Sequence, residues 1–213
     1  MNAGWNITGR GGLRICSVRK PAQKRMSAAL SAAANDIRCA SPKWQKDGCA
    51  SAASVVCSLD KNAPEPFKIT YWGSMAPPCC SVFTPKFNIG WMPEQLAIAD
   101  AVYNPDSPWW IFNELERYIS LSYNDFAPMA QEVFQPMEDE LIQQVEQAKS
   151  EYDGNDEKLK ALSQEAFERS IAAARDLTAK IKAKLPSTRI NYLMLDYFRD
   201  SADMCGMPYD LKL

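Results

Sequence analysis

The sequence predicts an α+β fold with short strands in its first half and long helices in its second. Short runs of β-branched, aromatic and small apolar residues alternate with Pro- and Gly-containing breaks between residues 49 and 84. Apolar residues then recur every three or four positions from residue 107 to residue 202, which is the period of an amphipathic helix. With 213 residues and 46% hydrophobic content, the chain can bury the core of one domain or of a large part of one.

The first two strands are expected to form a hairpin. Residues 49–59, CASAASVVCSL, are small and apolar, which suits a closely packed strand. Residues 60–66 form a polar, turn-rich break. Residues 67–72, FKITYW, begin with apolar and polar residues in alternation, so a second strand follows and pairs with the first.

A bend and a third strand come next. Pro77 and Pro78 interrupt the chain, and residues 81–84 regain strand character. We therefore expect a strand, a bend that carries Cys79 and Cys80, and another strand.

The first helix is predicted to start at residues 107–108. Ser107 is a typical N-cap residue, and Pro108 suits the first helical position. The aromatic residues Trp109, Trp110 and Phe112 follow. They could form a ligand platform, but aromatic residues at the start of a helix more often anchor its packing, which is the interpretation we favour.

Two long helices and a shorter one complete the fold. The second helix begins near Met129 and ends before Gly154, a residue that commonly terminates helices. The third covers residues 156–184, and a last helix covers residues 188–202. Because only a tight Asp-Gly-Asn-Asp turn joins the two long helices, they should form an antiparallel hairpin.

Charge is distributed unevenly along the chain. Residues 1–59 contain nine Lys and Arg residues and two acids, whereas residues 60–213 contain fifteen and twenty-four, for a net charge of −2. This balance argues against nucleic acid as a partner. Residues 1–35 are basic and free of acids, so we expect a disordered start or an extension outside the fold, with a transit peptide as the alternative. Residues 36–213 would then form the folded portion.

Histidine is absent, which removes Ser-His-Asp and Cys-His mechanisms and every histidine-ligated metal site. The seven cysteines contain no Cys-x-x-Cys pair, so we expect neither a metal nor a cofactor. Their odd number and irregular spacing favour a reducing, intracellular setting, and we expect the cytoplasm. No stretch of the sequence has the length and apolarity of a membrane span.

Two groups of residues invite catalytic interpretations. Cys79 and Cys80 could be a nucleophile pair, but no histidine can act as their base, so buried structural thiols are the better interpretation. The acids Glu114 and Glu116, and those at positions 138–140, could supply paired carboxylates. We expect them instead on solvent-facing helix surfaces, where their pKa values would not diverge.

Three segments together carry a resemblance to a known family. They are GCASAASVVCSL at residues 48–59, YWGSMAPPCCSVFTPKF at residues 71–87 and DSPWWIFNELERYISLSY at residues 106–123, followed by a long helical hairpin. In this order, over roughly residues 37–213, the chain resembles the C-terminal half of the dipeptidase A and secernin group. These are cysteine-type N-terminal-nucleophile (Ntn) hydrolases.

The resemblance implies the C-terminal part of a four-layer α/β/β/α sandwich that ends in a long antiparallel helical hairpin. In such enzymes an N-terminal Cys, Ser or Thr attacks an amide, and its own α-amine is the base, so no histidine is needed. Residues 1 and 2 are Met and Asn, and no catalytic residue is carried over. The matching strand-turn-strand segment, Trp72 through Ser81, implies either core scaffold or a substrate pocket, and the pocket residues would be Trp72, Ser74, Cys79, Cys80 and Ser81.

We therefore expect the C-terminal fragment of a dipeptidase-like amide hydrolase that lacks its nucleophile and is inactive alone. When the missing half completes it, its substrate would be a dipeptide or another small amide. The chain could also form a homo-oligomer. One alternative is a non-catalytic, secernin-like interaction protein that binds through its helical hairpin. Another is an acyltransferase of the same superfamily, in which an amine replaces water as the acceptor.

Overall fold

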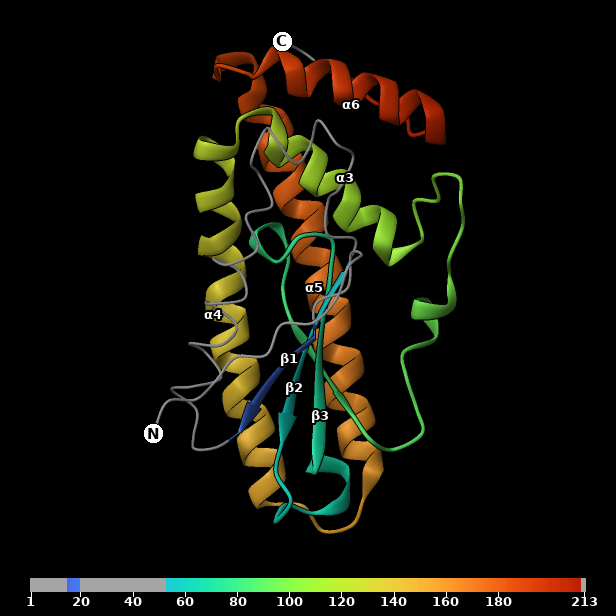
Figure 1. The fold of residues 1–213 in the computed structure, drawn as a ribbon, viewed down its shortest axis with the longest axis vertical. Coiled ribbons are helices and arrows are strands. Elements are labelled where there is room, and N and C mark those ends of the chain that lie inside the picture. Colours follow the sequence, from blue (N-terminus) through green and yellow to red (C-terminus); the bar gives the residue numbers. More distant parts are fainter. Residues whose placement is uncertain (1–14, 20–52, 212–213) are drawn as a thin grey trace.

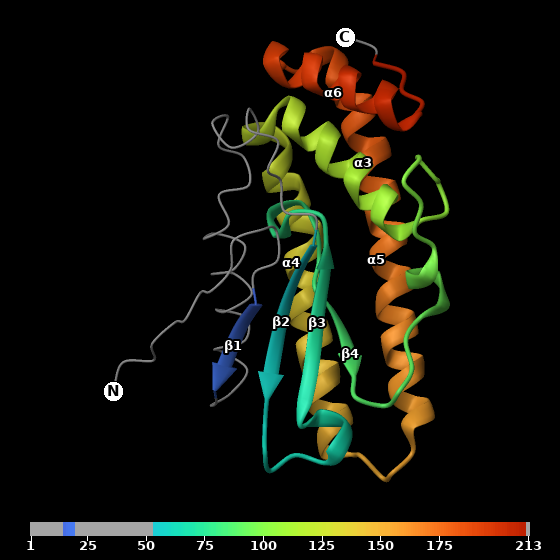
Figure 2. The ribbon, with the colours of Figure 1, turned by 45° about the vertical axis from the view of Figure 1, so that its right-hand side comes forward.

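The computed structural model describes the backbone of residues 15–19 and all atoms of residues 53–211. This part of the chain is a mixed α+β structure, as the sequence predicts (Figure 1). One small sheet packs against a pair of long helices, and two shorter helices cross near one end of that pair (Figures 1 and 2).

The sheet contains four strands in the order β1-β2-β3-β4. Their bounds are Ile15–Arg19 for β1, Ala53–Leu59 for β2, Ile69–Met75 for β3 and Thr84–Phe87 for β4. The predicted hairpin is confirmed, because β2 and β3 pair antiparallel, with Val56 opposite Trp72. β4 pairs antiparallel with β3, whereas β1 pairs parallel with β2. β1 was not predicted, and the rest of residues 1–35 and residues 49–52 lie outside the described part.

The two faces of the sheet have different surroundings. Val56 and Trp72 are buried against the long helices, and side chains alternate between faces along a strand. Residues one position away, such as Val55, Tyr71 and Gly73, therefore belong to the other face. On that face Tyr71 keeps 41% of its surface exposed.

The bend between β3 and β4 lies where the two prolines predict it. A short 3-10 helix, η2 (Pro78–Cys80), follows Ala76, whose φ of 60° reverses the chain direction. The next strand begins at Thr84 and not at residue 81 as predicted. The reason is that the Phe83 amide donates a 2.8 Å hydrogen bond to Glu138 Oε1 and not to a neighbouring strand.

Four α-helices follow the sheet. They are α3 (Pro108–Leu121), α4 (Tyr123–Ser150), α5 (Asp156–Lys184) and α6 (Tyr192–Cys205). The predicted bounds of α5 and the predicted start of α3 are confirmed. α4 begins at Tyr123, before the predicted Met129, and accommodates Pro128 and Pro136 within it. α6 starts after the predicted residue 188, because the Asn191 side chain caps it by accepting a hydrogen bond from the Leu193 amide.

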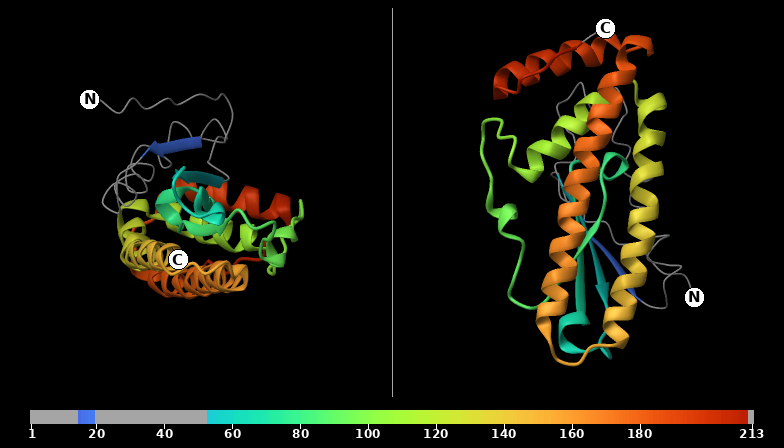
Figure 3. Two further views of the ribbon diagram at one scale, coloured as in Figure 1. Left: turned by 90° about the horizontal axis from the view of Figure 1, so that it is seen from below. Right: turned by 180° about the vertical axis from the view of Figure 1, so that it is seen from behind.

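The helices α4 and α5 form the predicted antiparallel hairpin and make one layer against the sheet (Figure 3). Two apolar clusters result. The first joins the sheet to the hairpin through Val56, Trp72, Phe83, Leu141 and Leu159. The second fills the space among α3, α5 and α6 with Leu115, Tyr118, Ile119, Leu177 and Phe198. Within residues 53–211, no helix combines the length and the apolarity that crossing a membrane requires.

Candidate functional site

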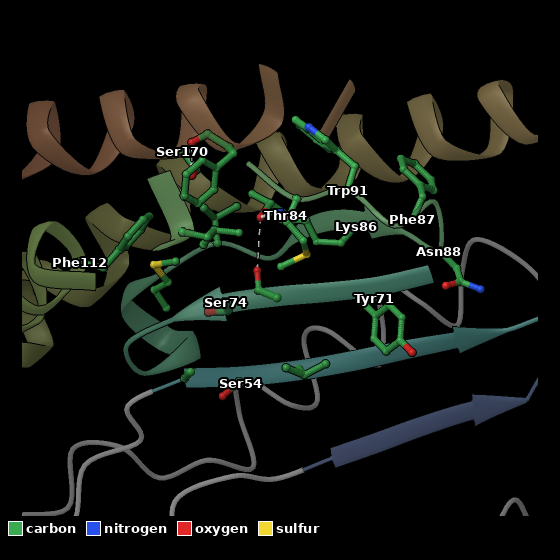
Figure 4. A pocket seen from close by; sticks show the side chains of 18 of the residues that line it. Ser54, Tyr71, Ser74, Thr84, Lys86, Phe87, Asn88, Trp91, Phe112 and Ser170 are labelled. Atoms are coloured by element: carbon green, nitrogen blue, oxygen red, sulfur yellow. Dashed lines mark hydrogen bonds between the residues drawn. The ribbon is translucent and has the colours of Figure 1, made fainter. Parts of the chain in front are cut away.

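A pocket of about 540 Å³ lies on the sheet face opposite Trp72 (Figure 4). The register explains its floor, because Val55 pairs with Gly73, Gly73 with Thr84, and Tyr71 with Lys86. These five residues share one face by strand alternation, and all of them line the pocket. The loop that follows β4, together with α3 and α5, supplies the remaining walls.

Most of the walls are apolar. The large side chains that contribute are Met75, Val82, Phe87, Trp91, Met92, Leu96, Phe112 and Phe167. Glycine keeps the centre of the floor open, since a Cβ added at Gly73 would meet no atom within 4 Å. The pocket volume is in the range of small-molecule sites, which is roughly 300–1,000 Å³.

Lys86 is the one charged residue among the described residues that line this pocket. Its side chain is only 7% exposed. Lys86 Nζ donates to Thr84 Oγ1 at 2.8 Å and to the Pro85 carbonyl at 3.3 Å, and it lies 5.4 Å from the centroid of the Phe167 ring. Burial lowers the pKa of this amine to about 8, because the charged form loses its hydration.

Hydroxyl groups contribute the remaining polarity near the pocket. Ser74 and Ser81 share a buried hydrogen bond of 2.7 Å between their Oγ atoms. Thr84 Oγ1 reaches the Gly73 carbonyl at 3.4 Å, and Ser170 Oγ donates to the Phe167 carbonyl of its own helix at 2.6 Å. A ligand in the pocket would therefore meet one amine and several hydroxyls on an otherwise apolar surface.

The structure places one of the five sequence-predicted pocket residues, Ser74, in the wall of this pocket. Ser81 does not line it but hydrogen-bonds to Ser74. Trp72 is fully buried on the opposite face, where its indole N–H finds no hydrogen-bond partner among the described residues. Cys79 and Cys80 are buried in the second apolar cluster, with their Sγ atoms 3.7 Å apart.

Sequence reasoning missed Lys86, Thr84, Phe167 and Ser170. One signal was present, since Thr84 and Lys86 are two positions apart and fall on the same face of a strand. The other two residues come from α5, and only the packing of α5 beside β4 brings them to the pocket (Figure 2).

The expectation that the helix acids face solvent is wrong for three of them. Glu138 is buried at 7% exposure, and burial raises its pKa to about 7 against the opposing effect of the Phe83 amide. Glu116 is half-buried, and desolvation likewise raises its pKa to about 7. Glu114 is also half-buried and binds Lys182 Nζ at 2.7 Å. Glu138 and Glu116 come from α4 and α3, and neither lines the pocket.

The described residues contain no group of three His, Cys, Asp or Glu side chains that could hold a metal ion. Comparisons of the chain with protein-family models, with curated proteins and with solved structures found no match.

Proposed function

We propose that this chain is the C-terminal part of a dipeptidase-like cysteine Ntn hydrolase, which cleaves a peptide or another small amide bond. In this proposal the nucleophilic cysteine and its α-amine lie outside the described residues, and the chain is inactive without them. The fold would be the C-terminal portion of an α/β/β/α sandwich, and the setting would be intracellular and reducing.

The observation that carries the proposal is the difference between the two faces of the sheet within the described residues. The helices α4 and α5 cover the face that contains Val56 and Trp72. The other face holds the pocket, and Tyr71 is exposed on it. One helical layer on one sheet is half of a four-layer sandwich, and the second sheet of such a sandwich would pack on the Tyr71 face.

The groups at the pocket suit an amide substrate as well. An amide offers a carbonyl acceptor and an N–H donor, which the hydroxyls of Thr84 and Ser74 and the amine of Lys86 could bind. The apolar walls would hold the side chains of the substrate. The nucleophilic thiolate and its α-amine would have to approach the bound substrate from the Tyr71 side of the sheet.

The test begins with the transcript upstream of the Met1 codon, read in all three frames for a segment that begins Cys-Thr or Cys-Asp. That segment and this chain are then co-expressed, and amino-acid release from a set of dipeptides is measured. We expect release by the pair, no release by this chain alone, and loss of release when the new cysteine is changed to serine. The absence of such a segment, or a stable pair without activity, would contradict the proposal. Transfer to an added amine acceptor, in place of hydrolysis, would assign the acyltransferase alternative.

A second candidate function is supported by one observation on α6. Leu193, Tyr197 and Met204 form an exposed apolar stripe, and Leu193 and Met204 keep 73% and 89% of their surface exposed. Exposed apolar stripes mark interaction surfaces, which favours the non-catalytic interaction protein. Among the described residues, no large apolar side chain of the α4-α5 hairpin is exposed, so α6 and not the hairpin would be the binding surface.

Sedimentation of the intact chain tests this candidate. Self-association that the Leu193→Ser and Met204→Ser double variant abolishes would assign the stripe to a homo-oligomer interface. A monomer over the whole concentration range would exclude that interface.

A further inference from the structure

We propose that the Lys86 pocket binds an amphipathic monocarboxylate, with the carboxylate on the Lys86 amine and an apolar body along the walls. The inference concerns ligand binding alone. It does not require the proposed hydrolase activity, and it would hold for a binding protein equally well.

The first argument is that the buried Lys86 amine has one hydrogen-bond donor and one positive charge without a partner among the described residues. A lysine ammonium carries three N–H donors, and Lys86 uses two of them, on Thr84 and on the Pro85 carbonyl. Within residues 53–211 Lys86 forms no ion pair, although a buried charge is costly unless it is paired. A bound carboxylate would take the third donor and supply the missing negative charge.

The second argument is the position of the amine. Lys86 Nζ lies 2.8 Å from the Thr84 hydroxyl and 5.4 Å from the centroid of the Phe167 ring, and both residues line the pocket. An oxygen atom that reached the amine would therefore also come within reach of the Thr84 hydroxyl. Charge-assisted hydrogen bonds of this kind are shorter and stronger than neutral ones, so they would fix the orientation of the head group.

The third argument is the character of the rest of the pocket. Trp91, Leu96, Phe112 and Phe167 present apolar surface, and burying apolar area is the main driving force for such a ligand. A phosphate dianion fits less well, since Lys86 is the one cationic side chain among the described lining residues. An uncharged apolar ligand would leave the amine unpaired. One carboxylate on an apolar body matches both parts of the pocket.

The experiment uses the intact chain and two probes that differ only in their head groups. Decanoate and 1-decanol are titrated into wild type and into Lys86→Met, an apolar replacement of similar length, and binding is followed by calorimetry. Lys180→Met is the matched control, because Lys180 is an exposed lysine on α5 that pairs with Asp176. We expect Lys86→Met to weaken decanoate binding by about ten- to a hundredfold, the usual effect of a hydrogen bond to a charged group. Lys86→Met should not weaken decanol binding, because the uncharged probe leaves the amine without a counter-charge, and Lys180→Met should change neither affinity.

A second variant tests the location independently of the charge. Gly73→Phe places an aromatic ring, which strands accept well, into the open centre of the pocket floor. It should block decanoate and decanol alike while thermal unfolding remains cooperative. Failure of wild type to bind decanoate would overturn the proposal. So would equal decanoate affinity in wild type and Lys86→Met, or unchanged binding in a folded Gly73→Phe.

Discussion

The Lys86 amine donates a 2.8 Å hydrogen bond to the hydroxyl of Thr84, two residues earlier on the same strand. Alternation along β4 places both side chains on the face of the sheet that holds the pocket. A hydroxyl satisfies a donor without neutralising a charge. The pocket therefore retains a buried amine with no carboxylate partner among the described residues, and the stability of the fold should reflect this.

Replacing Lys86 by methionine should stabilise the protein at pH 7. Burial lowers the pKa of this lysine from 10.5 to about 8, and this shift corresponds to about 3 kcal/mol at 1.36 kcal/mol per unit. The wild-type penalty is complete below pH 8. It is relieved as the pH rises from 8 toward 10.5, because the unfolded state then binds more protons than the folded state. Urea unfolding of Lys86→Met should therefore give a free energy of unfolding higher by about 1–3 kcal/mol at pH 7, and the gain should shrink above pH 8. A loss of stability at pH 7, with Lys180→Met unchanged, would count against the buried charge.

Glu138 should make the protein less stable as the pH rises from about 4.5 to 7. Burial raises its folded-state pKa from 4.5 to about 7, so the folded state binds more protons than the unfolded state across this window. The stability that protonated Glu138 contributes is fully present below the unfolded-state pKa of 4.5. It is lost as the pH rises through the folded-state pKa of about 7, and the total loss in the free energy of unfolding is about 3 kcal/mol. Glu138→Gln stays neutral and can still accept from the Phe83 amide. Its free energy of unfolding should vary less between pH 5 and pH 7.5 than that of wild type, whereas parallel curves would refute the assignment.

Adjacent residues on α4 should differ sharply in their importance for stability. Leu141 is fully buried between the sheet and the hairpin, so Leu141→Ala should cost about 2–5 kcal/mol. Glu140 pairs with Arg169 across the hairpin at 2.7 Å, but the two side chains keep 48% and 35% of their surface exposed, so water screens the pair. Glu140→Gln should therefore cost less than about 1 kcal/mol. Denaturant unfolding of both variants would test whether packing or surface charge holds the hairpin together.

Two glycines should respond in opposite ways to alanine. Gly154 lies in the turn between α4 and α5 at a φ of 91°, where a side chain is strained, so Gly154→Ala should destabilise by about 1 kcal/mol or more. Gly73 has no such φ, and its added Cβ would meet open space. Gly73→Ala should raise stability by about 0.4–1 kcal/mol through the lower entropy of the unfolded chain. Thermal melts of the pair provide the measurement, and a stabilising Gly154→Ala would contradict the described turn.

Local chemistry made much of the fold predictable. The β2-β3 hairpin follows from apolar runs around a polar break, and the bend at Pro77 and Pro78 follows from proline stereochemistry. The Ser107-Pro108 pair located the start of α3, although the Ser107 side chain makes no capping hydrogen bond, and the helical period of apolar residues located α5. The start of β4 was harder to predict, because it depends on a hydrogen bond between Phe83 and Glu138, which are 55 residues apart.

The candidate site could be predicted far less well. Glu138 was predicted to lie on a solvent-exposed helix face. Its hydrogen-bond partner, the buried Phe83 amide, is 55 residues away in the sequence, so no local pattern indicates the contact. Pattern reasoning also gave Lys86 no role, because burial of that amine requires Phe167 of α5 to pack over β4. Ser74 was identified through the strand-turn-strand segment, but Trp72, two positions earlier on the same face of β3, is buried against the long helices and does not line the pocket. Long-range packing, and not residue type, decides which side chains meet at the pocket.

The pKa of Lys86, measured by NMR on protein with isotope-labelled lysines, tests the account of the pocket most directly. The Lys86→Met variant assigns the signal by its disappearance. We expect titration near pH 8, below the ordinary lysine value, because the amine is buried without a carboxylate partner among the described residues. Titration near the ordinary lysine value of about 10.4 would show a hydrated or paired amine, and it would contradict the pocket described here.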